Sequence, residues 1–123
     1  MTDLNLPYNM DSQQRLAIET NLMDWVASPN PQVLRKPLER EKLESGQVTS
    51  IVRYEPGSHY HEHSHPSGEE ILVLDGEFKD ELGAYPKGSW IRSPHMSEHH
   101  PFVDVETLIL VKVGHLMTGQ SVE

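Results

Sequence analysis

The sequence contains no cysteine among its 123 residues. This absence excludes disulfide bonds, thiolate metal ligands, iron–sulfur clusters and any cysteine-based redox switch within the chain. A metal site in this protein would therefore depend on nitrogen and oxygen ligands from histidine, aspartate and glutamate.

Basic residues and long apolar runs are also scarce. The chain has 10 Lys and Arg against 19 Asp and Glu, with a formal net charge of -9, whereas nucleic-acid backbones and anionic membrane surfaces attract clustered basic residues. No apolar stretch approaches the roughly 20 residues that span a bilayer, and the first residues have neither the basic start nor the apolar middle of a signal peptide. We therefore expect a cytoplasmic protein that binds neither nucleic acid nor membrane.

One short segment concentrates basic residues but interleaves them with acidic ones: Arg35, Lys36, Arg40 and Lys42 against Glu39, Glu41 and Glu44. Alternating charges of this kind are typical of a solvated surface that neutralises itself. We expect an exposed charged face here rather than a phosphate site.

The length and composition are those of one globular domain. Short apolar or β-branched runs follow one another, and Asp75-Gly76 between two of them is a strong tight-turn signal. Several short strands at close spacing predict an all-β antiparallel barrel or sandwich. The expected strands are residues 47–54, 71–74, 77–81, 89–92 and 107–113.

The first 31 residues show little of this pattern. A short helix is expected to begin at Asp11 or Ser12, which are favourable N-caps, and Pro29 and Pro31 then interrupt regular structure. We predict an N-terminal arm (residues 1–31) with this helix and a dimerisation strand, a barrel (residues 32–117) and a flexible tail (residues 118–123).

The segment between Gly57 and Gly76 concentrates histidines at every second position, followed by acidic residues: His59, His61, His63 and His65, then Glu69 and Glu70. Alternate residues of a strand point to the same face, and imidazole and carboxylate groups together bind divalent transition metals. His63 and His65 are the first candidates. Glu69 is the candidate carboxylate, because an acidic side chain entering a buried strand needs a cation. His59 and His61 are expected at the rim, and a solvated histidine-rich loop is the alternative interpretation.

The spacing of these residues resembles the first motif of the cupin superfamily, G-x5-H-x-H-x3-E-x6-G, whose positions are occupied by Gly57, His63, His65, Glu69 and Gly76. A second cupin motif is similar to Gly83, Pro86 and Gly88, followed after a longer loop by His99. The resemblance implies a small double-stranded β-helix (jelly-roll) barrel with an N-terminal arm. It also implies a metal held by His63, His65, Glu69 and His99, with His100 as the alternative to His99.

Within the superfamily, residues 24–114 resemble the ChrR-type cupins, which include the C-terminal domain of the ChrR anti-sigma factor and stand-alone relatives near acetylacetone-cleaving dioxygenases. The resemblance implies one mononuclear divalent metal (Fe, Zn, Mn or Ni) and a homodimer. Trp25 and Val26 of the arm are expected to reach the neighbouring subunit, or Trp25 packs on its own barrel. The chain lacks the cysteines of the zinc domain with which such an anti-sigma factor grips its sigma factor, so direct sigma-factor inhibition is not expected.

The identity of the metal separates two functions. Four protein ligands complete the tetrahedral shell of zinc, which implies a structural or sensing role. The same ligands leave two positions open on octahedral Fe(II), Mn(II) or Ni(II), which favours a dioxygenase-type enzyme acting on a small oxygen-rich or diketone-like molecule. Metal-free sugar isomerisation is disfavoured because it does not need the complete ligand set.

An enzyme of this kind needs a pocket around the metal, for which the sequence offers several candidates but no assigned catalytic residue. Tyr54, Trp90 and Phe102 are expected to form apolar walls. Arg53 or Arg92 is expected to meet an anionic group. His61 and Met96, whose identities are unusual for the family, are expected near the metal.

Overall fold

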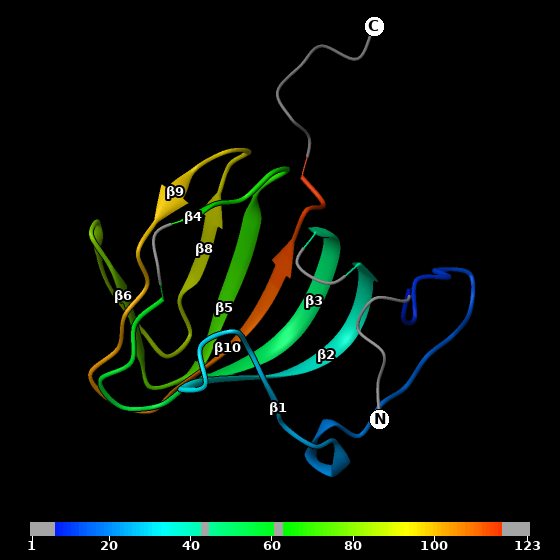
Figure 1. The fold of residues 1–123 in the computed structure, drawn as a ribbon, viewed down its shortest axis with the longest axis horizontal. Helices are drawn as coiled ribbons and strands as arrows, with labels where there is room; N and C mark the ends of the chain where they lie inside the picture. Colours follow the sequence, from blue (N-terminus) through cyan, green and yellow to red (C-terminus); the bar gives the residue numbers. More distant parts are fainter. Residues whose placement is uncertain (1–6, 43–44, 61–62, 117–123) are drawn as a thin grey trace, which may run out of the picture.

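The computed structural model describes residues 7–42, 45–60 and 63–116 of the chain (Figure 1). Within these residues the regular elements are antiparallel strands and one turn of 3-10 helix, η1 (Thr20–Leu22), and none forms a helix long and apolar enough to cross a membrane. The all-β prediction is confirmed. The strands are β1 (Val26–Ala27), β2 (Val33–Lys42), β3 (Ser45–Tyr54), β4 (His63–Ser64), β5 (Glu69–Asp75), β6 (Glu77–Asp80), β7 (Gly83–Pro86), β8 (Trp90–Ser93), β9 (Glu98–His99) and β10 (Thr107–Val113).

The strands form one large sheet and two small ones. The large sheet has the order β1-β2-β3-β10-β5-β8, and the pairs β4-β9 and β6-β7 make the small sheets. Figure 1 shows the large sheet strongly curved, with β4, β9 and β6 lying toward its β8 edge and away from β2. Because the sheet is curved, inward-pointing side chains from distant strands face a common interior.

Strand β5 shows how the inner face is made. Ile71 and Val73 are buried, whereas Leu72 and Leu74 between and after them are 37% and 38% exposed. The apolar run expected to be buried throughout therefore has one face on the core and one outside, as is usual for antiparallel strands. The core cluster collects such inward residues from several strands: Val33, Val52, Tyr54, Ile71, Val73, Phe78, Val103, Ile109 and Val111.

The predicted turn at Asp75-Gly76 connects β5 to β6. Gly76 has a φ of +78°, and a Cβ atom there would lie 2.4 Å from the carbonyl oxygen of Glu106. Both the backbone conformation and the lack of space require glycine at this position.

Strand β2 was not expected, because the sequence suggested an exposed charged face there. The strand pairs with β3 along its length, and Lys36 and Arg40 are only 8% and 1% exposed. A register shift between Pro37 and Glu39 adds a residue to β2, as in a β-bulge, so that Arg40 rather than Glu39 turns inward. The exposed-face prediction is wrong for Lys36 and Arg40.

The N-terminal arm packs on its own barrel. The helix expected from Asp11 is not formed, and η1 is the only helical turn among the described residues of the arm. Val26 pairs with Arg35 of β2, and the Trp25 ring lies 4.5 Å from Lys36 Nζ and 4.9 Å from Arg53 Cζ. Of the two placements expected for Trp25, the structure has the one on its own barrel. The domain boundaries stay a prediction.

Candidate metal centre

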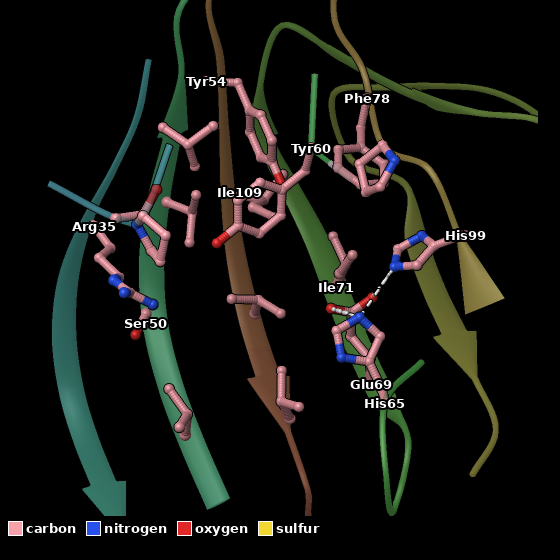
Figure 2. Close-up of a pocket in the computed structure, with 18 of the residues that line it drawn as sticks. Arg35, Ser50, Tyr54, Tyr60, His65, Glu69, Ile71, Phe78, His99 and Ile109 are labelled. Carbon is pink, nitrogen blue, oxygen red and sulfur yellow. Dashed lines mark hydrogen bonds and ion pairs between the residues drawn. The ribbon is translucent and has the colours of Figure 1, made fainter. Parts of the chain in front are cut away.

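Three buried side chains bring potential metal ligands to one point (Figure 2). His65 Nε2 lies 3.1 Å from His99 Nε2 and 3.2 Å from Glu69 Oε2, and His99 Nε2 lies 3.1 Å from Glu69 Oε1. The three residues are 6% to 9% exposed. Two imidazoles and a carboxylate thus face each other away from solvent.

The backbone between His65 and Glu69 explains how this cluster forms. The carbonyl of His65 accepts a hydrogen bond from the Gly68 N–H at 2.9 Å, with Pro66 second in the turn and a φ of 59° at Ser67, as in a type II turn. The turn reverses the chain so that Glu69 enters β5 beside His65. Glu69 then shares the inner face of β5 with Ile71 and Val73 because side chains alternate along a strand.

His99 arrives from a distant part of the chain. In the small sheet β4-β9, His63 pairs with His99, and the His65 carbonyl also accepts a hydrogen bond from Met96 N–H at 3.0 Å. This pairing holds the 63–65 segment against the 96–99 segment. His65 and His99 are 34 positions apart in sequence, and these backbone hydrogen bonds, together with the one from Ser67 N–H to His95 Nδ1 at 2.8 Å, bring their segments together.

The donor atoms fit a single divalent ion. Two ligand atoms about 2.1 Å from one metal lie about 3.0 Å apart at a right angle and about 3.4 Å apart at the tetrahedral angle, and the observed separations of 3.1 to 3.2 Å fall in this interval. Glu69 is 6% exposed, and its two oxygens lie 3.1 and 3.2 Å from the two imidazoles. A buried carboxylate is costly unless a cation pairs with it, and a divalent ion between the three side chains would be such a cation.

Asp80 on β6 lies behind His99 and was missed by the sequence analysis. Its Oδ1 accepts hydrogen bonds from the Leu82 N–H at 2.9 Å and the Tyr85 hydroxyl at 3.0 Å, and its Oδ2 lies 3.7 Å from His99 Nδ1. A carboxylate behind a histidine favours the tautomer whose other nitrogen is free to bind a metal. The only sequence signal was the alternation of Phe78 and Asp80 on one face of β6.

The electrostatics of the centre reflect its burial. Burial lowers the pKa of His99, but the hydrogen bond with Glu69 and the charges of Glu69, Asp80 and Glu81 outweigh it, so the net shift is upward. Burial, then the charge of Glu69, raise the pKa of Tyr54, which keeps its phenol protonated and able to donate a hydrogen bond. Protons and a metal would therefore compete for His99.

The centre lines a cavity of about 610 Å³ inside the barrel, within the usual range for small-molecule sites. Most of its wall is apolar, formed by inward residues of β3, β5 and β10 such as Val52, Ile71 and Ile109. Figure 2 shows His65, Glu69 and His99 on one side of this space, with Tyr54, Tyr60 and Phe78 toward one end. A small ligand in the cavity would reach the three donors.

The other histidines of the predicted row lie elsewhere or outside the described part. The side chain of His63 and the whole of His61 are not among the described residues. His59 is exposed, and its Nδ1 lies 3.3 Å from Nε2 of His100, which was the alternative to His99. The structure thus puts His99 at the cluster and pairs His100 with His59 near the surface.

Of the residues expected in the pocket, Tyr54 lines the cavity, but four others do not. Trp90 is 56% exposed because it pairs with Leu72 on the outer side of the sheet. Arg53 precedes the inward Tyr54 and so points outward to Trp25. Phe102 and Met96 lie in loops and are 36% and 51% exposed. A role of these four residues in a ligand site stays a prediction.

Comparison with known proteins identifies the family. Residues 13–117 match the model of the ChrR Cupin-like domain, and the chain belongs to this family. No curated protein matches the chain.

Solved structures show the same fold. An RmlC-like cupin from Ralstonia eutropha JMP134 superposes with a TM-score of 0.71 at 14% identity, covering 82% of this chain and 69% of that one. An acetylacetone dioxygenase from Acinetobacter johnsonii gives 0.67 at 18% identity, covering 92% and 80%. The anti-sigma factor ChrR of Rhodobacter sphaeroides, in complex with SigE, gives 0.62 at 19% identity, covering 75% of this chain and 50% of that one. The chain thus spans about half of the ChrR chain, and the predicted cupin barrel is confirmed.

Proposed function

We propose that this protein is a cupin with one mononuclear transition-metal centre held by His63, His65, Glu69 and His99, and that it is a dioxygenase-type enzyme acting on a small oxygen-rich or diketone-like molecule. The observation that carries the proposal is the convergence of three buried donors on the wall of a largely apolar cavity. A bound divalent metal supplies a Lewis acid and an orienting site for chelating oxygens.

The chain's own residues have defined tasks in this proposal. Asp80 orients His99 so that its Nε2 faces the cavity, and the protonated hydroxyl of Tyr54 offers a hydrogen bond to a ligand oxygen. Val52, Ile71 and Ile109 exclude water from the space beside the donors, which strengthens every electrostatic interaction there. The fold likeness to an acetylacetone dioxygenase supports the choice of substrate class.

Metal content is the first test. Elemental analysis of protein purified without added metal should find about one transition-metal ion per chain, because the buried donors are preformed in the fold. A folded protein without any metal, which also takes none up on addition of Fe(II), Mn(II), Ni(II) or Zn(II), would refute the proposed centre.

The ligand assignment has its own test. The double substitution His63→Ala and Glu69→Gln should abolish metal binding, whereas His59→Ala, an exposed histidine of the same segment, should leave it unchanged. Circular dichroism of the variants verifies that the barrel is folded. Equal loss of metal in the His59 variant would show that the assignment is wrong.

Oxygen consumption separates the enzyme from the second candidate function. Fe(II)-loaded protein should consume oxygen in the presence of small diketones. The family and the fold likeness to ChrR favour the alternative of a metal-dependent sensor with a protein partner. No oxygen uptake, together with tight zinc binding, would support the sensor.

The assembly and location of the protein stay predictions. A homodimer is expected from the resemblance, and light scattering of the purified chain measures it. A cytoplasmic location is expected from the composition.

A further inference from the structure

The wall of the cavity formed by β2 carries two arginines. Arg35 and Arg40 both line the space that contains the metal donors, although sequence analysis expected them on the surface. Figure 2 shows the Arg35 side chain reaching from β2 toward β3, on the side of the cavity away from His65, Glu69 and His99. Arginine is rarely found in a protein interior unless it is paired.

The inward direction of the Arg40 side chain is set by the register of β2. Arg40 is 1% exposed and pairs with Val48, which pairs with Val113, which in turn pairs with Glu69. It therefore belongs to the same cross-strand line as the carboxylate of the metal centre. The irregularity after Pro37 creates this register, because an unbroken alternation would send Glu39 inward instead.

A buried hydroxyl lies close to Arg35 in the fold. Ser50 on β3 is 2% exposed and lines the cavity, and its Oγ makes no hydrogen bond in the residues that are described. A buried hydroxyl in this state is costly unless a ligand or water satisfies it. Ser50 and Arg35 together offer donors of the kind that bind a carboxylate.

The described lining carries charges of both signs. Arg35 and Arg40 line the cavity together with Glu69, and a divalent metal beside Glu69 would offset the negative charge of that carboxylate. Strands β2 and β5 are separated by β3 and β10, which is about 14 Å between backbones at about 4.8 Å per strand. The inward side chains shorten this span to the length of a small molecule.

We propose that the cavity selects a small organic acid, with chelating oxygens at the His65, Glu69 and His99 side and a carboxylate bound by Arg35, with Ser50 as an additional donor and Arg40 as a second positive charge. This inference rests on the proposed metal centre and narrows its substrate class from small oxygen-rich or diketone-like molecules to those that carry a carboxylate. Arginine binds carboxylates through paired N–H groups, which gives both affinity and direction.

The test compares a carboxylate with its methyl ester, which lacks the charge and carries one more methyl group. Ni(II)-loaded protein is titrated calorimetrically, without oxygen, with 4,6-dioxoheptanoate and with its methyl ester. Both carry the same diketone, but only the acid offers a carboxylate. We expect the acid to bind about 10 to 100 times more tightly, as for a charge-assisted hydrogen bond in a buried site, and equal affinities would overturn the proposal.

Variants assign the preference to Arg35. The substitution Arg35→Gln should remove most of the acid-over-ester preference while the ester binds as before, and Arg35→Lys should restore part of it. The matched control is Arg92→Gln, because Arg92 has the same charge but its side chain is 59% exposed and bonded to Glu70 outside the cavity. A preference that persists in Arg35→Gln, or that is lost in Arg92→Gln, would overturn the role of Arg35.

The readout separates this inference from the proposed enzyme activity. Because the titration needs no turnover, a retained preference in a protein that never consumes oxygen would support the anion site and contradict the dioxygenase. Oxygen uptake with neutral diketones, combined with equal affinity for acid and ester, would support the dioxygenase and contradict the anion site.

Discussion

Two neighbouring lines of residues cross the same strands of the large sheet, one on each face. The outer row consists of Glu39, Thr49, Lys112, Glu70 and Arg92. The inner row consists of the adjacent residues Arg40, Val48, Val113, Glu69 and Ser93. Each row contains both acidic and basic side chains, yet the two rows use them differently.

In the outer row the charges are bonded to their neighbours. Glu39 Oε1 accepts hydrogen bonds from Thr49 Oγ1 at 2.6 Å and from Lys112 Nζ at 3.0 Å. Glu70 is bonded to Arg92 Nε at 2.8 Å and to His115 Nε2 at 2.6 Å. Such cross-strand pairs at the surface hold the strands in register, and each contributes little to stability.

In the inner row two valines keep the acid and the base apart. Arg40 and Glu69 both line the cavity, with Val48 and Val113 between them along the row. The outer face thus pairs its charges across neighbouring strands, whereas the inner face places Arg40 and Glu69 with two strands between them, an arrangement that agrees with the proposed ligand site.

The largest expected difference between the faces is in packing. Val73→Ala should lower the free energy of unfolding by about 2 kcal/mol, because it removes two carbons from a side chain with no exposed surface and leaves a void. Leu74→Ala, at the next residue of β5, removes three carbons but should cost about 1 kcal/mol or less, since Leu74 is 38% exposed. Urea denaturation measures both, and a larger effect at Leu74 would show that the assignment of the faces is wrong.

An intermediate effect is expected at the residue behind the metal centre. Asp80→Asn removes the charge that faces His99 Nδ1 and should weaken metal affinity about 10- to 100-fold, as for other partners of metal-bound histidines. Competition with a chelating dye measures the affinity. The control is Asp104→Asn, an aspartate whose side chain is 69% exposed and paired with Lys79, which should leave the affinity unchanged. Unchanged affinity in the Asp80 variant would exclude an orienting role.

The smallest effect is expected in the outer row. The hydrogen bond from Thr49 lowers the pKa of Glu39; burial opposes this shift, and Lys112 adds to it. A lowered pKa means that the fold favours ionised Glu39. The stabilisation of the fold by ionised Glu39 is therefore present above the ordinary glutamate pKa, and it is lost as the pH falls through the lower pKa of the folded state. Glu39→Gln should therefore cost less than about 1 kcal/mol at neutral pH.

The pH dependence distinguishes this contribution from a packing effect. The difference in the free energy of unfolding between Glu39→Gln and the unchanged protein should shrink as the pH falls below about 4. Denaturation across a pH series measures this difference. The exposed Glu106→Gln serves as control and should show no such trend. A difference that grows toward acid would contradict the sign of the shift.

The parts of the fold that were predictable from sequence are those with local signals. The β-branched run of β10 is observed from Thr107 to Val113, as expected, and the turn at Gly76 follows from a backbone conformation that glycine adopts most easily. Strand β2 was missed because its charges alternate without an apolar face. Its strand conformation comes from pairing with β3, which no local pattern indicates.

The site also contains residues that local sequence signals predict and residues that they do not. The spacing from His65 to Glu69 is a short-range feature, since one turn joins the two residues. The likeness of the second motif brought in His99, whereas the sequence did not place Asp80, Arg35 or Ser50 at the site, and Arg35 was expected on the surface. Arg35 and Ser50 line the cavity because of the register between β2 and β3, and Asp80 lies behind His99 because β6 packs there. Both placements are properties of the assembled sheets.

The all-β class, the nitrogen and oxygen character of any metal site, and the metal-ligand motif follow from composition and short-range spacing. These conclusions depend on residue types and on the two-residue repeat of a strand. The face that each charge occupies depends instead on how the strands pair. A shift of one residue in pairing reverses every side chain after it, and this reversal put Arg40 inside the barrel and left Glu39 outside.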